Sequence, residues 1–377
     1  MIEVDDSLKV CLVTILLATA ISVHNVGLVK LVSAVIGRLQ VKRLISQQQP
    51  ISSDADSDNK DASVSGIFVY PVKSLRAVSL DEARIDDNGI VGDRRFMLVM
   101  PRPVPLLGSF RPGEPTFQFV TQRQVPKLAT IVATLSADCL TLSSSDDGQK
   151  KVSVQLNIDE KERPSYKARI WDDVTTVTDM GDDAANFVAG VVAKDSDAPP
   201  NAANVRLVSM SAENRRETDD KYTPNAALSW TGAAPKVGLT DGFPILIANT
   251  ASLEELNRRL AKKGKEPIPM SRFRPNIVVS GAKPFEEDTW KVISIGDGVL
   301  LHIVKGCPRC KQSCTDQQTG KVSEEPLETL AEFRALGPVK ENVYFAQNAI
   351  AHTVRGTLSV GAKVHVLERG EPTWDSS

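Results

Sequence analysis

Short apolar or alternating segments, separated by turns rich in Gly, Pro and Asp, dominate the chain from residue 66 onward. Runs of this kind with β-branched and aromatic side chains predict β-strands. In the first half they predict strands at 66–72, 77–80, 83–85, 96–100, 117–121, 129–135, 140–142, 152–156, 168–171 and 175–178. In the second half they predict strands at 205–210, 243–248, 277–279, 290–295, 299–304 and two within 357–366. The close spacing is typical of a β-barrel or sandwich.

Only three segments carry helix signals. Residues 182–192 place small and apolar side chains on one face, at the spacing of an α-helix. Ser252 is predicted to be the N-cap of a second helix, because acidic residues follow it and basic residues end the segment. Residues 326–333 predict a third helix. The pattern therefore predicts a β-rich α+β fold with few helices.

The N-terminal region has a different pattern. Residues 10–29 form a run of twenty residues without a charged side chain, about the length that spans a bilayer. Acidic residues dominate before this run and basic residues follow it, so the positive-inside rule places the bulk of the chain in the cytosol. We therefore predict a short tail at 1–9 and a transmembrane anchor at 10–29. The alternatives are a cleaved signal peptide, which the acidic start disfavours, and a buried core helix.

Composition changes divide the rest of the chain. Residues 30–65 begin with basic side chains and continue with a polar, Asp- and Ser-rich stretch, which predicts a juxtamembrane segment and flexible tether. A Pro-, Ala- and Asp-rich stretch at 195–203 predicts a boundary. We therefore expect one domain at 66–200, a second at 201–368 and a tail at 369–377.

Charge and cysteine content exclude some classes of function. The net charge of -2 gives no electrostatic footprint for nucleic acid. Five cysteines, unevenly spaced, argue against a disulfide scaffold and for a reducing compartment.

Residues 305–316 form a cysteine-rich stretch, predicted as a loop that leaves a strand. It holds Cys307, Cys310 and Cys314 among basic side chains, which favour the thiolate form. A structural zinc site or an iron–sulfur cluster needs four suitably spaced ligands, and the remaining cysteines and histidines do not supply them. A redox pair, ordinary thiols, or one thiolate ligand for a metal carried by an organic cofactor all remain open.

Five motifs then resemble a known family. Tyr70–Ser74 and Gly92–Arg95 resemble the start of the MOSC N-terminal β-barrel domain. The segments that resemble the MOSC domain itself, also a β-barrel, are Phe273–Asn276, Phe285–Trp290 and Cys307–Cys310 with Thr319-Gly320 after it. Together with an N-terminal anchor, the chain resembles the mitochondrial amidoxime-reducing component family from Gly66 to about Val366.

The resemblance implies a molybdenum cofactor, and pyridoxal phosphate is not expected. Cys310 falls on the position of the molybdenum ligand and is therefore the expected catalytic residue, whereas Cys314 is expected to be structural. The positions that would hold the cofactor are Lys73, Ser74, Arg94, Gly242, Phe243, Arg274, Asn276, Pro308, Arg309 and Asn348.

The chemistry of these side chains agrees with such a ligand, because Lys and Arg form charge-assisted hydrogen bonds with phosphate and Asn can pair with the amide-like edge of a pterin. Without the resemblance, Lys73 and Arg94 could equally be solvated turn residues, and Asn276 a turn cap.

The function implied by the resemblance is reduction of N-hydroxylated compounds such as amidoximes and hydroxylamines. No cysteine follows Cys314, so electrons are expected from separate proteins, by resemblance cytochrome b5 and NADH-cytochrome b5 reductase. The implied location is the mitochondrial outer membrane, with the folded domains facing the cytosol. The alternatives are a carrier of molybdenum cofactor or sulfur without reductase turnover, and a tethered β-domain whose cysteines bind nothing.

Overall fold

The computed structural model describes residues 62–103, 114–145, 150–157, 160–195, 198–211, 216–223, 235–296, 298–352 and 356–376. The predicted anchor at 10–29 and the tether up to residue 61 lie outside these ranges. Among the helices within them, none combines the length and apolar character needed to cross a membrane.

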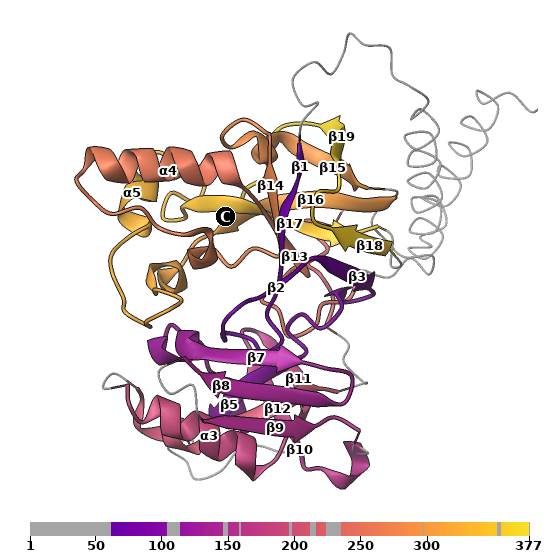
Figure 1. The fold of residues 1–377 in the computed structure, drawn as a ribbon, viewed down its shortest axis with the longest axis vertical. Helices are drawn as coiled ribbons and strands as arrows, with labels where there is room; N and C mark the ends of the chain where they lie inside the picture. The colour runs from indigo at the N-terminus through magenta and orange to yellow at the C-terminus, as the bar shows by residue number, and fades with distance from the viewer. Residues whose placement is uncertain are drawn as a thin grey trace, which may run out of the picture.

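The lower unit in Figure 1 contains a closed five-stranded barrel and a separate three-stranded sheet. The barrel strands, in spatial order, are β10 (Ser165–Ile170), β11 (Asp173–Asp179), β12 (Arg206–Met210), β5 (Phe96–Pro101) and β6 (Phe117–Phe119). The second sheet consists of β7 (Ile131–Leu135), β8 (Cys139–Ser144) and β9 (Lys151–Gln155). Helix α3 (Asp182–Val192) matches its predicted range and contributes Val188 to the same core as Leu140 of β8 and Leu98 of β5.

The upper unit is built on an eight-stranded sheet. Its strands, in spatial order, are β19 (Val364–Arg369), β15 (Trp290–Ile295), β16 (Val299–Pro308), β17 (Tyr344–Ala351), β13 (Ile245–Asn249), β14 (Ile277–Ser280), β1 (Ser63–Val69) and β2 (Val78–Leu80). A small sheet beside it contains β18 (Gly356–Ser359), β3 (Glu82–Asp86) and β4 (Gly89–Ile90). The helices here are α4 (Thr250–Lys262) and α5 (Leu327–Ala331). These features confirm a β-rich fold with few helices.

Short 3-10 helices complete the described structure. They are η1 (Pro126–Thr130), η2 (Glu160–Glu162), η3 (Pro200–Asn204), η5 (Met270–Arg272), η6 (Glu286–Thr289) and η7 (Lys311–Cys314).

Strand pairing interleaves the two sequence halves. β1 pairs with β14 and β2, so the first strands of the chain complete the upper sheet. Conversely, β12 comes from the second half of the chain, after residue 200, but it pairs with β11 and β5 in the lower barrel. Each unit therefore contains strands from both sides of the predicted boundary.

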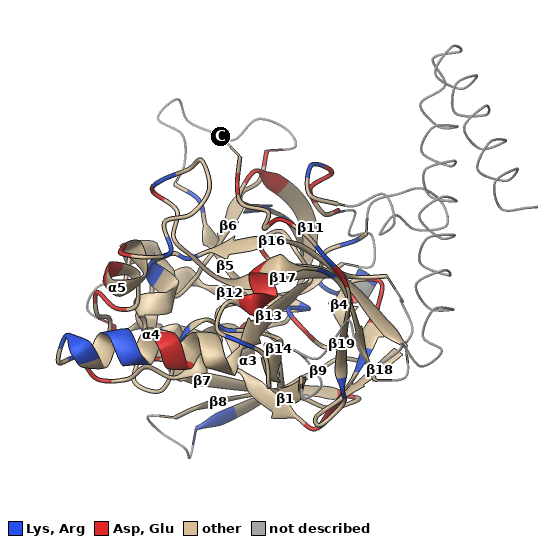
Figure 2. Cartoon of the chain, turned by 90° about the horizontal axis from the view of Figure 1, so that it is seen from above, with Lys and Arg blue, Asp and Glu red and all other residues tan. Residues whose placement is uncertain are grey.

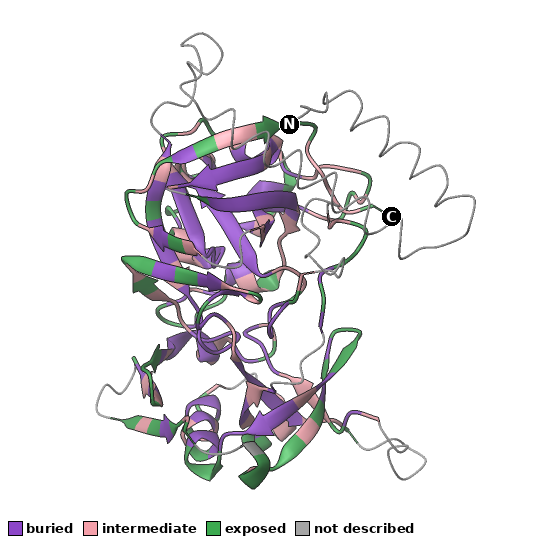
Figure 3. Ribbon diagram, turned by 90° about the vertical axis from the view of Figure 1, so that its right-hand side faces the viewer, coloured by how far each residue is buried: buried purple, intermediate pink, exposed green. Residues whose placement is uncertain are grey.

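The central strands of the upper sheet are buried on both faces and are mostly purple in Figure 3, whereas its edge strands β19 and β2 are partly exposed. Along β13, Ile245 and Ile247 enter one core cluster, whereas Leu246 and Ala248 enter the cluster beneath α4. Successive side chains of a strand point to opposite faces, so burial of both faces produces the continuous apolar run seen in the sequence. Figure 2 shows that α4 carries acidic residues in its first half and basic residues towards its end.

Two local predictions were wrong. Asn249, not Ser252, caps α4, because the Asn249 side chain accepts the Ala251 N–H at 3.0 Å. The Ser252 hydroxyl instead donates to the Glu287 carboxylate at 2.7 Å. The predicted loop at 305 begins later, since β16 continues through Pro308.

A buried carboxyl group lies behind α4. Glu287 is fully buried and receives hydrogen bonds from Ser252 and from the Asn249 side-chain amide, the latter at 3.0 Å. Burial, and then the nearby Asp288 charge, raises the pKa of Glu287 from 4.5 to about 7. The folded state thus retains a proton between pH 4.5 and 7 that the unfolded state has released.

Because the folded state binds more protons in that window, the free energy of unfolding falls as the pH rises through it. Glu287→Gln removes this titration. We expect the variant's free energy of unfolding, relative to wild type, to rise by about 3 kcal/mol between pH 4.5 and 8. Urea unfolding across this range measures the difference, with Glu254→Gln on the exposed side of α4 as the control. A difference independent of pH would contradict the assignment.

Candidate functional site

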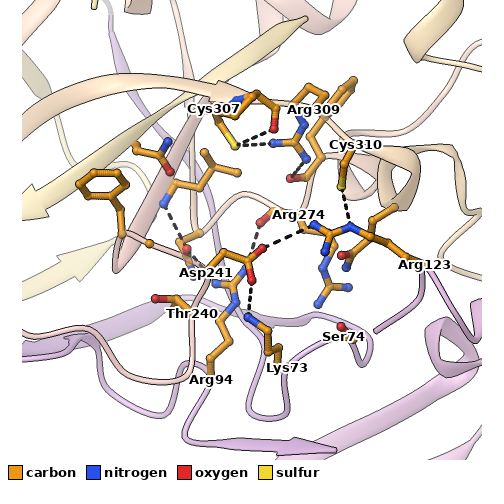
Figure 4. A pocket seen from close by; sticks show the side chains of 18 residues that line it. Lys73, Ser74, Arg94, Arg123, Thr240, Asp241, Arg274, Cys307, Arg309 and Cys310 are labelled. Carbon is orange, nitrogen blue, oxygen red and sulfur yellow. Dashed lines mark hydrogen bonds and ion pairs between the residues drawn. The ribbon is translucent and has the colours of Figure 1, made fainter. Parts of the chain in front are cut away.

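A solvent-open pocket lies where the two units meet (Figure 4), with an empty volume of about 780 Å³ including the part open to solvent. All eleven residues predicted for the site line this pocket. Lys73, Ser74 and Arg94 come from turns between β1 and β5. The predicted residues from the second half are Gly242, Phe243, Arg274, Asn276, Pro308, Arg309, Cys310 and Asn348.

The second-half residues are positioned by neighbouring strands of the upper sheet. Gly242 and Phe243 precede β13, and Arg274 and Asn276 precede β14. Pro308 ends β16, and Arg309 and Cys310 follow it directly. Asn348 lies on β17, which is hydrogen-bonded between β13 and β16. The sheet order therefore brings together side chains that are far apart in sequence.

The lower side of the pocket is organised around Asp241. The Lys73 ammonium donates to the Asp241 carboxylate at 2.5 Å and to the Leu239 carbonyl at 2.9 Å. The Trp171 indole N–H donates to the same carboxylate at 3.0 Å. Burial lowers the pKa of Lys73 to about 8, although Asp241 opposes this shift. Partial enclosure raises the pKa of the Asp241 carboxyl, but Lys73 and then Arg123 outweigh it and hold the pKa below its usual range.

Arg94 joins the two units at the back of the pocket. Its guanidinium pairs with Asp93 at 2.6 Å and donates to the Asn276 side-chain oxygen at 3.0 Å. The Asp93 side chain is only 1% exposed and also accepts the Tyr70 N–H. The guanidinium carbons of Arg94 and Arg274 each lie 4.2 Å from the centre of the Tyr70 ring. Such contacts let buried cations lie close together.

A second polar link lies next to Ser74 and Arg274, two of the residues that line the pocket. Gln122 and Gln317 exchange hydrogen bonds of 3.0 and 2.7 Å between their side-chain amides. Gln122 also donates to the Ser74 carbonyl, and Arg274 donates to the Gln317 oxygen at 2.8 Å. Burial lowers the pKa of Arg274 to about 10. The Arg274 charge is therefore held in a desolvated position and faces the pocket.

Two thiols line the upper side. Arg309 donates to the Cys307 sulfur at 3.0 Å and to the Phe273 carbonyl at 2.9 Å. Burial raises the pKa of Cys307, outweighing the nearby Arg309 charge. The Nε–H of Arg123 donates to the Cys310 sulfur at 3.1 Å, so the two thiols have different cationic partners. Cys314 is buried outside the pocket and donates to the Glu324 carbonyl.

Three of the pocket residues have a strained backbone. Ser74, Arg94 and Arg274 have φ angles of 69°, 46° and 57°. Side chains other than Gly adopt this left-handed region rarely. Such residues cluster at functional sites, where the surrounding structure holds them in place. Here Arg94 and Arg274 are themselves strained and Ser74 directly follows Lys73, so a strained backbone accompanies three of the pocket's cations.

The pocket fits an anionic, hydrogen-bonding ligand. Its lining contributes Lys73, Arg94, Arg123, Arg274 and Arg309 against the single carboxylate of Asp241. Two buried polar atoms, Thr240 Oγ1 and Arg309 Nε, have no hydrogen-bond partner, although such atoms are normally paired. Among the described residues no group of three His, Cys, Asp or Glu side chains could hold a metal ion.

Sequence reasoning missed Arg123 and Asp241. Arg123 contacts the Cys310 thiol and lies 4.7 Å from the centre of the Trp171 ring. Asp241 is adjacent to the predicted Gly242, but no motif in the sequence marks it. Both lie in polar segments that look like ordinary turns, and only the fold shows that they face the pocket.

Comparison with known proteins agrees with this geometry. Residues 61–195 match the MOSC N-terminal beta barrel domain and residues 234–365 match the MOSC domain. The chain is 30% identical over 312 residues to the bovine protein named mitochondrial amidoxime reducing component 2, covering 81% of this chain and 83% of that protein. The chain belongs to the mitochondrial amidoxime reducing component family.

Another protein named amidoxime-reducing component shows a similar relation, and two further proteins show a more distant similarity. Human component 1 is 30% identical over 317 residues, covering 81% of this chain and 82% of that protein. A bovine molybdenum cofactor sulfurase is 25% identical over 317 residues, and there the match covers 82% of this chain but 33% of the sulfurase. Among solved structures, the YuaD protein of Bacillus subtilis covers 80% of this chain and 93% of its own at 12% identity, with a TM-score of 0.27.

Proposed function

We propose that the chain is a molybdenum-cofactor-dependent reductase of N-hydroxylated compounds such as amidoximes and hydroxylamines. The observation that carries the proposal is the meeting, in one pocket, of the Cys310 thiol with cations from both halves of the chain. Two buried unpaired polar atoms in the same pocket support a bound ligand. The relatives named amidoxime reducing component support the reaction class.

In this proposal, different side chains would bind different parts of the cofactor. Cys310 would bind the metal as a thiolate, a soft ligand. Arg94, Arg274 and Lys73 would pair with the phosphate and other acceptors, because charge-assisted hydrogen bonds suit anionic groups. Asn276 and Asn348 would contact the pterin edge, together with Ser74, Gly242, Phe243, Pro308 and Arg309 on the surrounding walls. When bound, the cofactor supplies two-electron chemistry at a metal that can take up the oxygen of an N–O bond.

The chain's own residues hold the charges that surround the pocket. The Lys73 ammonium, with a pKa of about 8, retains its proton at neutral pH and presents it to Asp241. Arg123 donates its Nε–H to the Cys310 sulfur, and hydrogen bonds to a ligand atom orient and tune metal ligands. Cytochrome b5 and NADH-cytochrome b5 reductase are the proposed electron donors. The proposed location is mitochondrial, on the outer membrane and facing the cytosol.

The test is metal and pterin analysis of the full-length protein made in cells that synthesise the cofactor. We expect about one molybdenum and one pterin per chain, and NADH-dependent reduction of an aromatic amidoxime when both electron-transfer proteins are added. Protein with cofactor but without turnover would overturn the reductase proposal. Protein with neither molybdenum nor pterin would overturn cofactor binding altogether.

A carrier of cofactor or sulfur is a second candidate. The similarity to a molybdenum cofactor sulfurase favours it, as does a second pocket thiol, Cys307, beside an arginine. Mass spectrometry of the intact protein distinguishes the two functions. A persulfide without molybdenum would support the carrier, whereas stoichiometric molybdenum with turnover would support the enzyme.

A further inference from the structure

Residues 373–376 dock against the strand that leads into the pocket. These residues contact Lys291 of β15, Gly306 of β16 and Tyr344 of β17. The Gly306 N–H donates to the Thr373 carbonyl at 2.9 Å, and the Lys291 ammonium donates to the Thr373 hydroxyl at 2.8 Å. The Trp374 ring lies 4.8 Å from the Tyr344 ring, centre to centre. Residues 373–376 therefore contact three neighbouring strands of the upper sheet, β15, β16 and β17.

Two glycines leave the space that Trp374 occupies. A Cβ atom at Gly306 would lie 2.4 Å from the Trp374 ring, and one at Gly337 would lie 2.6 Å from the Trp374 Cβ. Real Cβ atoms do not approach other heavy atoms so closely. The Arg334 guanidinium carbon lies 5.6 Å from the centre of the same ring. Docking of Trp374 thus depends on the absence of side chains at both positions.

Asp375 adds a charged contact at the same place. Its carboxylate pairs with Lys305 and accepts hydrogen bonds from the Tyr344 hydroxyl and the Asn342 amide, both at 3.1 Å. The Lys305 and Asp375 side chains are 12% and 18% exposed. A pair that is largely shielded from water is screened less by salt than a surface pair.

The contacts fall on the part of β16 where regular pairing fails. The register with β17 shifts between Ile303 and Lys305 and again between Gly306 and Pro308. Between these irregularities, Thr373 supplies the acceptor for the Gly306 N–H. The next residues, Cys307 to Cys310, line the pocket. A second set of contacts links residues 373–376 to the pocket wall. The Ser376 N–H donates to the Tyr222 hydroxyl, and the centre of the Tyr222 ring lies 6.5 Å from that of Phe243.

We propose that residues 373–376 are a positioning segment for the site: they fix the bulged end of β16 and so place Cys307, Arg309 and Cys310 around the pocket. Placement of the thiols is a property of the chain itself. Only the effect on cofactor occupancy rests on the proposed function.

The first test measures thiol placement in cofactor-free protein. Trp374→Ala and Asp375→Asn are alkylated with iodoacetamide, and peptide mass spectrometry follows each cysteine. We expect the rates at Cys307 and Cys310 to rise at least threefold, while the rate at Cys139, in the lower unit, stays constant. Val364→Ala, which removes buried volume from β19 away from the segment, is the control for general destabilisation. Wild-type rates at both pocket cysteines, or an equal rise in Val364→Ala, would overturn the proposal.

A double-mutant cycle tests the docking of Trp374 directly. Gly306→Ala alone should raise both alkylation rates, because the added methyl group displaces the Trp374 ring. Adding Trp374→Ala to Gly306→Ala should give no further rise, since the contact is already lost. Rates that multiply in the double variant would show that the two residues act independently and would contradict the proposal.

The final readout is molybdenum per chain in protein made in cofactor-producing cells. Trp374→Ala and Asp375→Asn should hold at least threefold less molybdenum than wild type and than Val364→Ala. Wild-type occupancy in both variants would overturn a role in cofactor placement. If wild-type protein itself holds no molybdenum, the proposed function fails, and the alkylation rates still decide whether the segment positions the thiols.

Discussion

Cys310→Ala is expected to lower amidoxime reduction at least 100-fold while leaving the melting temperature within a few degrees of wild type. Loss of a residue that only supports a metal ligand typically costs roughly 10- to 100-fold in activity or affinity, so loss of the ligand itself should cost more. The Cys310 side chain contacts Arg123 at the pocket surface and caps no helix through its side chain. Turnover with NADH and both electron-transfer proteins, together with thermal unfolding, measures the two effects.

Cys139→Ala is the matched control, because Cys139 is a half-buried thiol of β8, outside the pocket. It should retain wild-type turnover. Substantial activity in Cys310→Ala would refute the assignment of Cys310 as the metal ligand.

Arg94→Met is expected to lower the free energy of unfolding by about 3 to 5 kcal/mol, the usual effect of removing one partner of a buried ion pair. The Asp93 carboxylate, 1% exposed, would keep only the Tyr70 N–H as a described partner. Asn276 would lose its contact with the Arg94 guanidinium as well. Urea unfolding at neutral pH measures the loss.

Two further variants test whether the lost stability comes from leaving the buried Asp93 charge unpaired. Arg95→Met breaks a pair whose partner, Asp86, is 42% exposed, so it should cost no more than about 1 kcal/mol. Adding Asp93→Asn to Arg94→Met removes the unpaired charge and should recover much of the stability. Equal losses in Arg94→Met and Arg95→Met would contradict a buried role for Asp93 and Arg94.

The sequence predicted individual strands well where one or both faces are apolar, as in β13 and β15, because burial imposes a visible pattern. β17 was missed, since Gln347 and Asn348 interrupt its apolar run. The roles of these two polar residues become visible only in the fold. Gln347 donates to the buried Asp288 at 2.6 Å, and Asn348 lines the pocket.

Prediction of the site from the sequence was limited in the same way. Motifs placed Cys310, Arg274 and Lys73 in the candidate site, and the structure brings these side chains into one pocket. Local sequence contained no comparable signal for Arg123 or Asp241, whose importance comes from contacts across the interface between units. The left-handed backbone at Ser74, Arg94 and Arg274 was equally invisible, because these residues do not favour that conformation on their own.

The exchange of β1 and β12 between the units has a consequence for dissecting the molecule. A fragment cut near residue 200 would leave β14 without its neighbour β1 and leave β5 and β11 without β12. Both pieces would expose unpaired strand edges, which promote aggregation. Chimeras between relatives should therefore exchange β1 to β4 together with β13 to β19 and keep β12 with β5 to β11, so that every hydrogen-bonded ladder comes from a single parent.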